Sequence, residues 1–200
     1  MQQMETVESA LAPSASDAVE ASRAGERAIV RGIARYDGFA RLLHWIFAVA
    51  ILYATLAGYA LAQLADGPLR EFLSCLNMSI ATVLIVLFPL RVWWACVRVA
   101  PRALHGVSAT QRALAHGVHR LMYLTIFAVL ASGYLMVPRG YSFFGLIEIP
   151  TPFEEGPLIG QLFAFHRASC AMLAGLVVLH VLAVVKHQWI ARNNVLDRML

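Results

Sequence analysis

The sequence predicts an all-α integral membrane protein built as a four-helix bundle. Of its 200 residues, 60% are hydrophobic and 14% are charged, and the mean hydropathy of +0.66 lies above the usual range of soluble domains. Windows of about 20 residues locate four apolar stretches that are long enough to cross a bilayer. These spans cover about residues 40–64, 72–97, 114–137 and 162–189. Together they predict one membrane domain over residues 31–200.

Residues 1–30 differ in composition from the four spans. They are rich in Ala, Ser and Glu, and they do not have the basic start and apolar core of a secretory signal. We predict a disordered cytoplasmic tail. The alternative is a short amphipathic helix on the membrane surface.

Basic residues flank the spans unevenly, and this bias predicts the orientation. Nine of them lie beside the two termini and the middle loop: Arg31, Arg35, Arg41, Arg98, Arg102, Arg112, Lys186, Arg192 and Arg198. The other two loops contain only Arg70 and Arg139. The positive-inside rule therefore predicts that both termini are cytoplasmic. The net charge of +4 follows from this pattern, so the expected partner is membrane lipid and not nucleic acid.

The cysteines do not form a recognisable metal or haem-attachment motif. Cys75, Cys96 and Cys170 lie in separate spans, and no C-x-x-C-H sequence occurs. Their number and spacing argue against covalent haem attachment, an iron-sulfur cluster or structural zinc. We predict that they pack in the core.

The fourth span carries three histidines on one helix face. At about 100° and 1.5 Å per residue, His166, His180 and His187 form a stripe, with the first two about 21 Å apart along the axis. Ionisable residues in hydrocarbon usually face the bundle interior, where they pair or bind a cofactor. The alternative is a set of structural histidines that bond to neighbouring carbonyl groups.

The first span also contains a histidine, His44, at about the same membrane depth as His180. His44, in "RLLHWIFA", lies a little over one turn into the first span, on the predicted cytoplasmic side. This pair supports bis-histidine ligation of a haem iron in a bundle core. Small residues at Ala174, Gly175 and Ala183 would leave room for a flat macrocycle, although they could equally let two helices approach closely.

Four segments together resemble the bacterial cytochrome b561 family, which includes the superoxide:ubiquinone oxidoreductase and is related to the cytochrome b subunits of formate dehydrogenase and hydrogenase. The segments are "RLLHW", "AHGVHRLMYL", the spacing of His166 and His180, and the closing "LHVLAVVKHQWIARNNVLDRML". The resemblance covers about residues 36 to 200. It implies two b haems stacked across the membrane, with His44 and His180 as the ligands of the cytoplasmic-side haem.

The outer haem site departs from the family pattern. The resemblance implies His166 and a histidine near the start of the second span as its ligands, but "NMSIATVLIVLFPLR" has Asn77 at that position, with Arg91 at the expected arginine. Three outcomes remain open: the outer haem is absent, is five-coordinate on His166, or is ligated by Met78. We expect loss or altered ligation of this haem.

Further polar residues are expected near the cytoplasmic surface. From their position, His119, His187 and Arg41 are candidates to bond haem propionates or to supply protons to a quinone. The resemblance implies that the quinone site lies near His187, with ubiquinone as the candidate quinone. The alternative is snorkelling and hydrogen bonding at the membrane interface. The loop over residues 138–159 is expected to face the periplasm and to dock a redox partner protein, or else to contribute aromatic residues to an interfacial belt.

The predicted function is that of an inner-membrane b-type cytochrome that passes electrons between a donor and the quinone pool. It would act either as a stand-alone oxidoreductase taking electrons from superoxide or another periplasmic donor, or as a membrane subunit serving a dehydrogenase or cytochrome c. The alternative is a redox-inactive membrane anchor or assembly protein with a degenerate haem site.

Overall fold

The computed structural model describes residues 35–99, 101, 108–192 and 195–200, together with residues 16, 17, 19, 20, 22 and 23. Those six residues of the N-terminal region are helical. The rest of residues 1–30 lies outside the described residues, so the disordered tail remains a prediction. Arg31, Arg102 and His105 also lie outside them.

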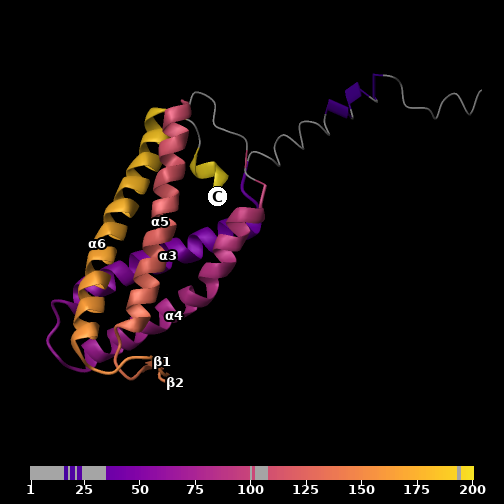
Figure 1. Ribbon diagram of the computed structural model, residues 1–200. Helices are drawn as coiled ribbons and strands as arrows, with labels where there is room; N and C mark the ends of the chain where they lie inside the picture. Colours follow the sequence, from indigo (N-terminus) through magenta and orange to yellow (C-terminus); the bar gives the residue numbers. More distant parts are fainter. Residues whose placement is uncertain are drawn as a thin grey trace, which may run out of the picture.

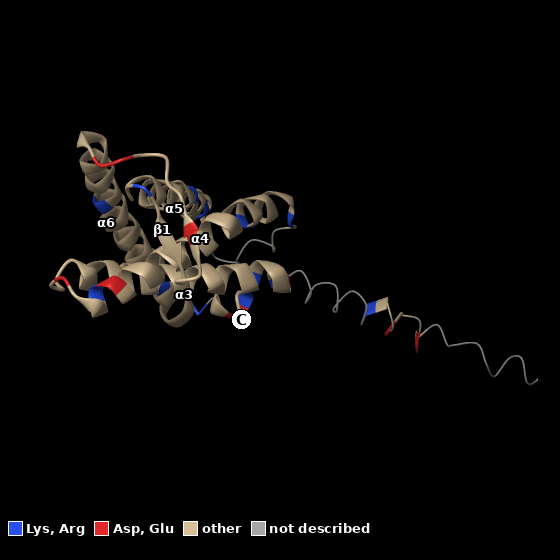
Figure 2. Ribbon diagram, turned by 90° about the horizontal axis from the view of Figure 1, so that it is seen from below, with Lys and Arg blue, Asp and Glu red and all other residues tan. Residues whose placement is uncertain are grey.

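Four long helices form the described chain: α3 (Gly38–Leu61), α4 (Pro68–Val97), α5 (Ala109–Leu135) and α6 (Pro157–Val185). Within the described residues, four helical segments are long and apolar enough to cross a membrane, the last continuing from Pro157 to Ile190. Most of the ribbon of these helices is tan in Figure 2, which marks residues that are neither acidic nor basic. The predicted all-α membrane bundle is therefore confirmed.

Local sequence explains where these helices begin. Asp37 caps α3, since its carboxylate accepts a hydrogen bond of 2.8 Å from the Ala40 N–H, and Ser108 and Gln111 form a capping box at the start of α5. Pro68 and Pro157 begin α4 and α6, where a missing N–H leaves no helical bond unmade.

The helices pack as two pairs that cross each other. α3 lies against α4, and α5 against α6, with a smaller contact between α4 and α5 (Figure 1). A small apolar core lies where the pairs meet, and all four helices contribute to it: Phe47, Leu84, Ile126, Leu130 and Leu173. The backbones of α3 and α6 are not among the closely packed helix pairs.

The loop between α5 and α6 contains a β-hairpin that the sequence analysis did not predict. Strands β1 (Tyr141–Phe143) and β2 (Ile147–Ile149) pair antiparallel. Its turn includes Phe144 and Gly145, both with positive φ. The hairpin is fixed to α4, because the Ser79 hydroxyl accepts a 2.8 Å bond from the Phe144 N–H and the Cys75 thiol lies 3.3 Å from the Ser142 carbonyl oxygen. It lies at the opposite end of α5 from the C-terminal segment (Figure 1).

The end of the fourth span departs from α-helical geometry. A π-helical turn, η1 (Lys186–Ile190), follows α6, and a 3₁₀ turn, η2 (Leu196–Arg198), ends the chain. The segment around η2 returns to α3: the Trp45 indole N–H donates a 2.9 Å bond to the Met199 carbonyl, and the Arg41 guanidinium bonds the Leu200 carbonyl oxygen.

Candidate functional site

Three imidazole rings from three helices converge in one half of the bundle. His44 of α3 and His180 of α6 have ring centroids 6.4 Å apart with planes tilted by 59°. His119 of α5 lies 5.3 Å from His180, nearly perpendicular to it at 80°. The structure thus brings together the two predicted ligands and places His119 beside one of them.

The helix α4 places Arg91 beside the histidine cluster, which is formed by His44, His119 and His180. The Arg91 Nη2 lies 3.5 Å from the His44 Nδ1, which is a long hydrogen-bond distance. Its guanidinium carbon lies 5.3 Å from the centroid of the Phe47 ring and 5.6 Å from that of the Tyr123 ring. These aromatic faces attract the cation, so a positive group is held beside His44 inside the bundle.

Two further polar atoms at this end have spare hydrogen-bonding capacity. In the part of the chain that the structure describes, the buried Arg41 Nε and the buried His187 Nδ1 have no hydrogen-bond partner. His187 lies in the π-helical turn, a feature that occurs frequently at functional sites. Buried polar atoms normally find a partner. Both atoms are therefore available to a bound polar group.

The geometry of the cluster fits a haem held by two imidazoles. A centroid separation of 6.4 Å leaves room for one metal ion between two ring nitrogens that each bind at about 2 Å. Gly175, one of the small residues before His180, is exposed, and a Cβ there would meet nothing within 4 Å. Among the described residues, no three His, Cys, Asp or Glu side chains are grouped to hold a metal ion by themselves, whereas haem iron needs only two axial ligands.

The third histidine of the predicted stripe has different surroundings. His166 turns toward α5, where its Nδ1 lies 3.0 Å from the Ser132 Oγ and 3.1 Å from the Val129 carbonyl oxygen. Its ring packs on Gly133, where a Cβ would lie 3.1 Å from the His166 Cε1. The carbonyl bond matches the structural alternative for this residue. Its Nε2 lies 3.4 Å from the Cys170 Sγ.

The outer region does not supply a second imidazole. Asn77 has a buried Oδ1 without a partner among the described residues, and no hydrogen bond there joins it to His166. An amide oxygen is not one of the usual axial ligands of haem. The described residues here therefore do not fit a bis-histidine haem.

The cysteines depart in part from the core-packing prediction. Cys96 is exposed, so the prediction is wrong for this residue, while Cys75 and Cys170 are half-buried. The contacts of Cys75 with the hairpin and of Cys170 with His166 join segments distant in sequence or side chains one turn apart. Only the contact of Cys75 with Ser142, 67 residues away, depends on the tertiary structure, because Cys170 and His166 are neighbours on one helix.

Comparison with known proteins decides the family. The sequence model described as prokaryotic cytochrome b561 matches residues 35–200. The chain belongs to this family. Cytochrome b561 homolog 2 of Escherichia coli (strain K12) is 28% identical over 172 residues, covering 83% of this chain and 91% of the relative. The probable superoxide oxidase CybB of Yersinia pestis is 25% identical over 161 residues, covering 79% and 91%.

Membership in the cytochrome b561 family confirms the resemblance inferred from the four sequence segments. The chain is accordingly a bacterial membrane cytochrome of the b type that takes part in electron transfer and binds b-type haem. Which residues ligate the haem remains a prediction. Sequence reasoning missed the contact of Ser132 and Gly133 with His166, although two adjacent small residues in a span are a recognisable sign of close helix packing.

Proposed function

We propose that this cytochrome b561 family member binds one haem b between His44 and His180 and passes single electrons between a donor and the quinone pool of the bacterial inner membrane. The observation that carries this assignment is the convergence of the two imidazoles across separated helices, with centroids 6.4 Å apart. When bound, haem supplies a one-electron couple at its iron, and two imidazole ligands leave no open position for oxygen.

The surrounding residues have separate roles in this proposal. Arg91, held over Phe47 and Tyr123, places positive charge beside His44, where it opposes an additional positive charge at the iron. The Arg41 Nε and His187 Nδ1, both without a hydrogen-bond partner in the described chain, would bond the propionate groups. His187 would alternatively exchange protons with a quinone at this end of the bundle.

The proposal includes one haem and not two. Asn77 stands where the family has a histidine, and His166 is bonded to α5 through Ser132 and Val129. A five-coordinate haem on His166, or ligation by Met78, would require His166 Nε2 to leave its contact with Cys170. Loss of the outer haem needs no such rearrangement and is therefore favoured.

Orientation is proposed from the charge distribution. The basic residues beside both termini and the middle loop support cytoplasmic termini. In that orientation the histidine cluster would lie in the cytoplasmic half. The hairpin of β1 and β2 would then lie on the periplasmic side, where it is available to a redox partner protein.

The electron donor has two candidates. One relative is named as a probable superoxide oxidase, which supports superoxide as a donor. However, a single haem in the cytoplasmic half cannot by itself relay electrons from the periplasmic side across the membrane. This favours a role as a membrane subunit that serves another redox protein. A redox-inactive anchor is the alternative function, and it would contain no haem.

The experiment is a measurement of haem per chain by pyridine haemochrome, together with the reduced-minus-oxidised spectrum of the purified protein. We expect about one low-spin haem per chain. His180→Ala should remove the six-coordinate spectrum, whereas His116→Ala, at an exposed position of α5, should leave it unchanged. A native protein without absorbance in the Soret region would support the anchor instead, and a low-spin spectrum that survives His180→Ala would reject the ligand pair.

A further inference from the structure

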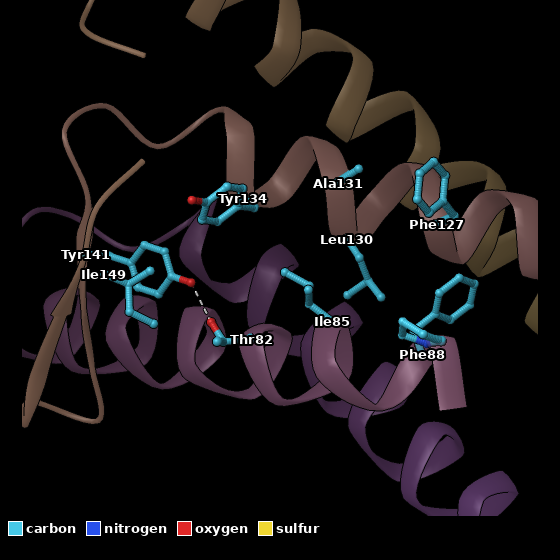
Figure 3. A pocket seen from close by; sticks show the side chains of 10 residues that line it. Thr82, Ile85, Phe88, Phe127, Leu130, Ala131, Tyr134, Tyr141 and Ile149 are labelled. Atoms are coloured by element: carbon cyan, nitrogen blue, oxygen red, sulfur yellow. Dashed lines mark hydrogen bonds between the residues drawn. The ribbon is translucent and has the colours of Figure 1, made fainter. Parts of the chain in front are cut away.

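A cavity lies between α4, α5 and the hairpin, and neither His44 nor His180 lines it. Its volume is about 320 Å³, within the range of about 300–1,000 Å³ that small-molecule sites occupy. Phe88 and Phe127 line one end, and Thr82, Tyr134 and Tyr141 the other (Figure 3). Pro89 also lines the cavity. No charged side chain lines it, so it suits a neutral ligand.

The cavity opens toward the lipid. Phe127 is 60% exposed and Pro89 is also exposed, and both lie within segments that cross the membrane. A ligand dissolved in the bilayer can therefore enter sideways between α4 and α5 without passing through water. This route favours a hydrophobic molecule.

Hydroxyl groups gather at the end beneath the hairpin. The Thr82 Oγ1 donates a 2.8 Å bond to the Met78 carbonyl and accepts one of 2.5 Å from the Tyr141 hydroxyl. The Tyr141 oxygen thus keeps lone pairs for a ligand hydroxyl, and its O–H can turn to donate to a ligand carbonyl. A lipid acyl chain cannot form a hydrogen bond with the Tyr141 hydroxyl. A quinone carbonyl could accept a hydrogen bond from it, and a quinol hydroxyl could donate one to it.

The opposite end of the cavity contacts residues beside the histidine cluster. Phe88 stacks on Phe127 with ring centroids 6.4 Å apart, and it also lies 6.3 Å from Phe47 and 6.2 Å from Tyr123. Phe47 and Tyr123 are the two rings that hold Arg91. Phe88 therefore lines the cavity and also contacts the two rings that hold Arg91 beside the candidate haem ligand His44.

Pro89 leaves the backbone carbonyl of Ile85 without its usual helical donor at the same site. Proline has no backbone N–H, so the helical bond to the carbonyl of Ile85 is missing. Both Pro89 and Ile85 line the cavity. A broken helical bond in a membrane span is tolerated where a neighbouring group or a bound molecule meets the freed carbonyl.

We propose that this cavity, lined by Thr82, Phe88, Phe127, Tyr134 and Tyr141, binds the ring of a membrane quinone, with Tyr141 as its hydrogen-bonding partner. The choice of a quinone as occupant rests on the electron-transfer function proposed above. The site is distinct from a quinone position near His187, because it lies between α4 and α5 on the hairpin side of Phe88. Phe88 connects the cavity to Phe47 and Tyr123, the rings that surround Arg91 beside His44.

The test uses the full chain in phospholipid nanodiscs and a photoreactive azido-ubiquinone, with the labelled peptides identified by mass spectrometry. We expect labelling on α4 and α5 around the cavity, displaced by excess unlabelled ubiquinone. Ala131→Phe, which fills the cavity from α5, should lower this labelling at least tenfold. Leu124→Phe, which adds a ring at a lipid-facing position of the same helix (67% exposed), should leave it unchanged.

A second variant tests the polar contact without changing the cavity's shape. Tyr141→Phe removes one hydroxyl and should weaken binding about fivefold, the effect of one hydrogen bond. Labelling confined to η1 near His187, labelling that ubiquinone does not displace, or labelling unaffected by both Ala131→Phe and Tyr141→Phe would overturn the site. Because this assay detects binding and not electron transfer, specific labelling of a protein without haem would reject the proposed function while retaining the cavity as a quinone site.

Discussion

The rings of His119 and His180 meet edge to face, with centroids 5.3 Å apart. His119 also has its Nδ1 2.7 Å from the carbonyl oxygen of Ala115, one turn earlier in α5. Nδ1 must donate this bond, so the neutral ring keeps its proton there and presents Nε2 as a lone pair. A predicted iron ligand therefore has a polar ring with a fixed tautomer beside it.

This contact predicts that His119 tunes the haem potential without binding the iron. The polar imidazole of His119 is expected to stabilise the ferric state, which carries one more positive charge than the ferrous state. His119→Phe keeps a ring at this position but removes that stabilisation. We expect unchanged haem per chain and a midpoint potential raised by about 40 mV, the equivalent of about 1 kcal/mol for one electron. A potentiometric titration followed by absorbance checks this. Loss of the low-spin spectrum would instead assign a ligand role to His119.

The second prediction concerns the outer site. Asn77→His restores the family pattern on α4, and we expect haem per chain to rise from about one toward two, measured by pyridine haemochrome. Asn77→Leu is the matched control, which should add no haem. It should also raise thermal stability, because a buried polar atom without a partner costs about 1–3 kcal/mol and the Oδ1 is such an atom in the described chain. Two low-spin haems in the native protein would contradict the proposed loss.

The third prediction tests the close approach of α5 and α6. Gly133→Ala would place a Cβ 3.1 Å from the His166 Cε1, so the ring must shift. We expect a destabilisation of about 1–3 kcal/mol, as for other overpacked sites, seen as a lower unfolding temperature in detergent. Gly117→Ala, where nothing lies within 4 Å, should leave stability equal or raise it by up to about 1 kcal/mol. Equal effects of the two substitutions would argue against a tight contact at Gly133.

The fourth prediction concerns topology. A reporter fused after Leu200 should behave as cytoplasmic, and one inserted at Gly145, in the turn of the hairpin, should behave as periplasmic. The expectation follows from the basic residues that flank both ends of the membrane domain. Alkaline phosphatase and green fluorescent protein fusions report the two sides. Periplasmic activity after Leu200 would reverse the orientation and place the histidine cluster in the outer half.

Sequence alone determined the fold class and the family, because both depend on local properties. Apolar length and composition identify a membrane helix without knowledge of its neighbours, and "RLLHW" and "AHGVHRLMYL" are continuous segments. The similar depth of His44 and His180 follows from counting residues along each helix, whereas the gap at Asn77 follows from comparison with the family pattern. Those features could be predicted before any helix was placed beside another.

The tertiary structure decided which faces meet. Helical spacing put His166 on one stripe with His180, but packing turned His166 toward Ser132 and Val129, since the absence of a side chain at Gly133 lets α5 approach it closely. Likewise the hairpin depends on bonds from Ser79 and Cys75 of α4, more than 60 residues away in sequence. The cavity beside Phe88 also exists only between elements. Side-chain spacing fixes the positions along a helix, whereas the partners across the bundle depend on how pairs of helices cross.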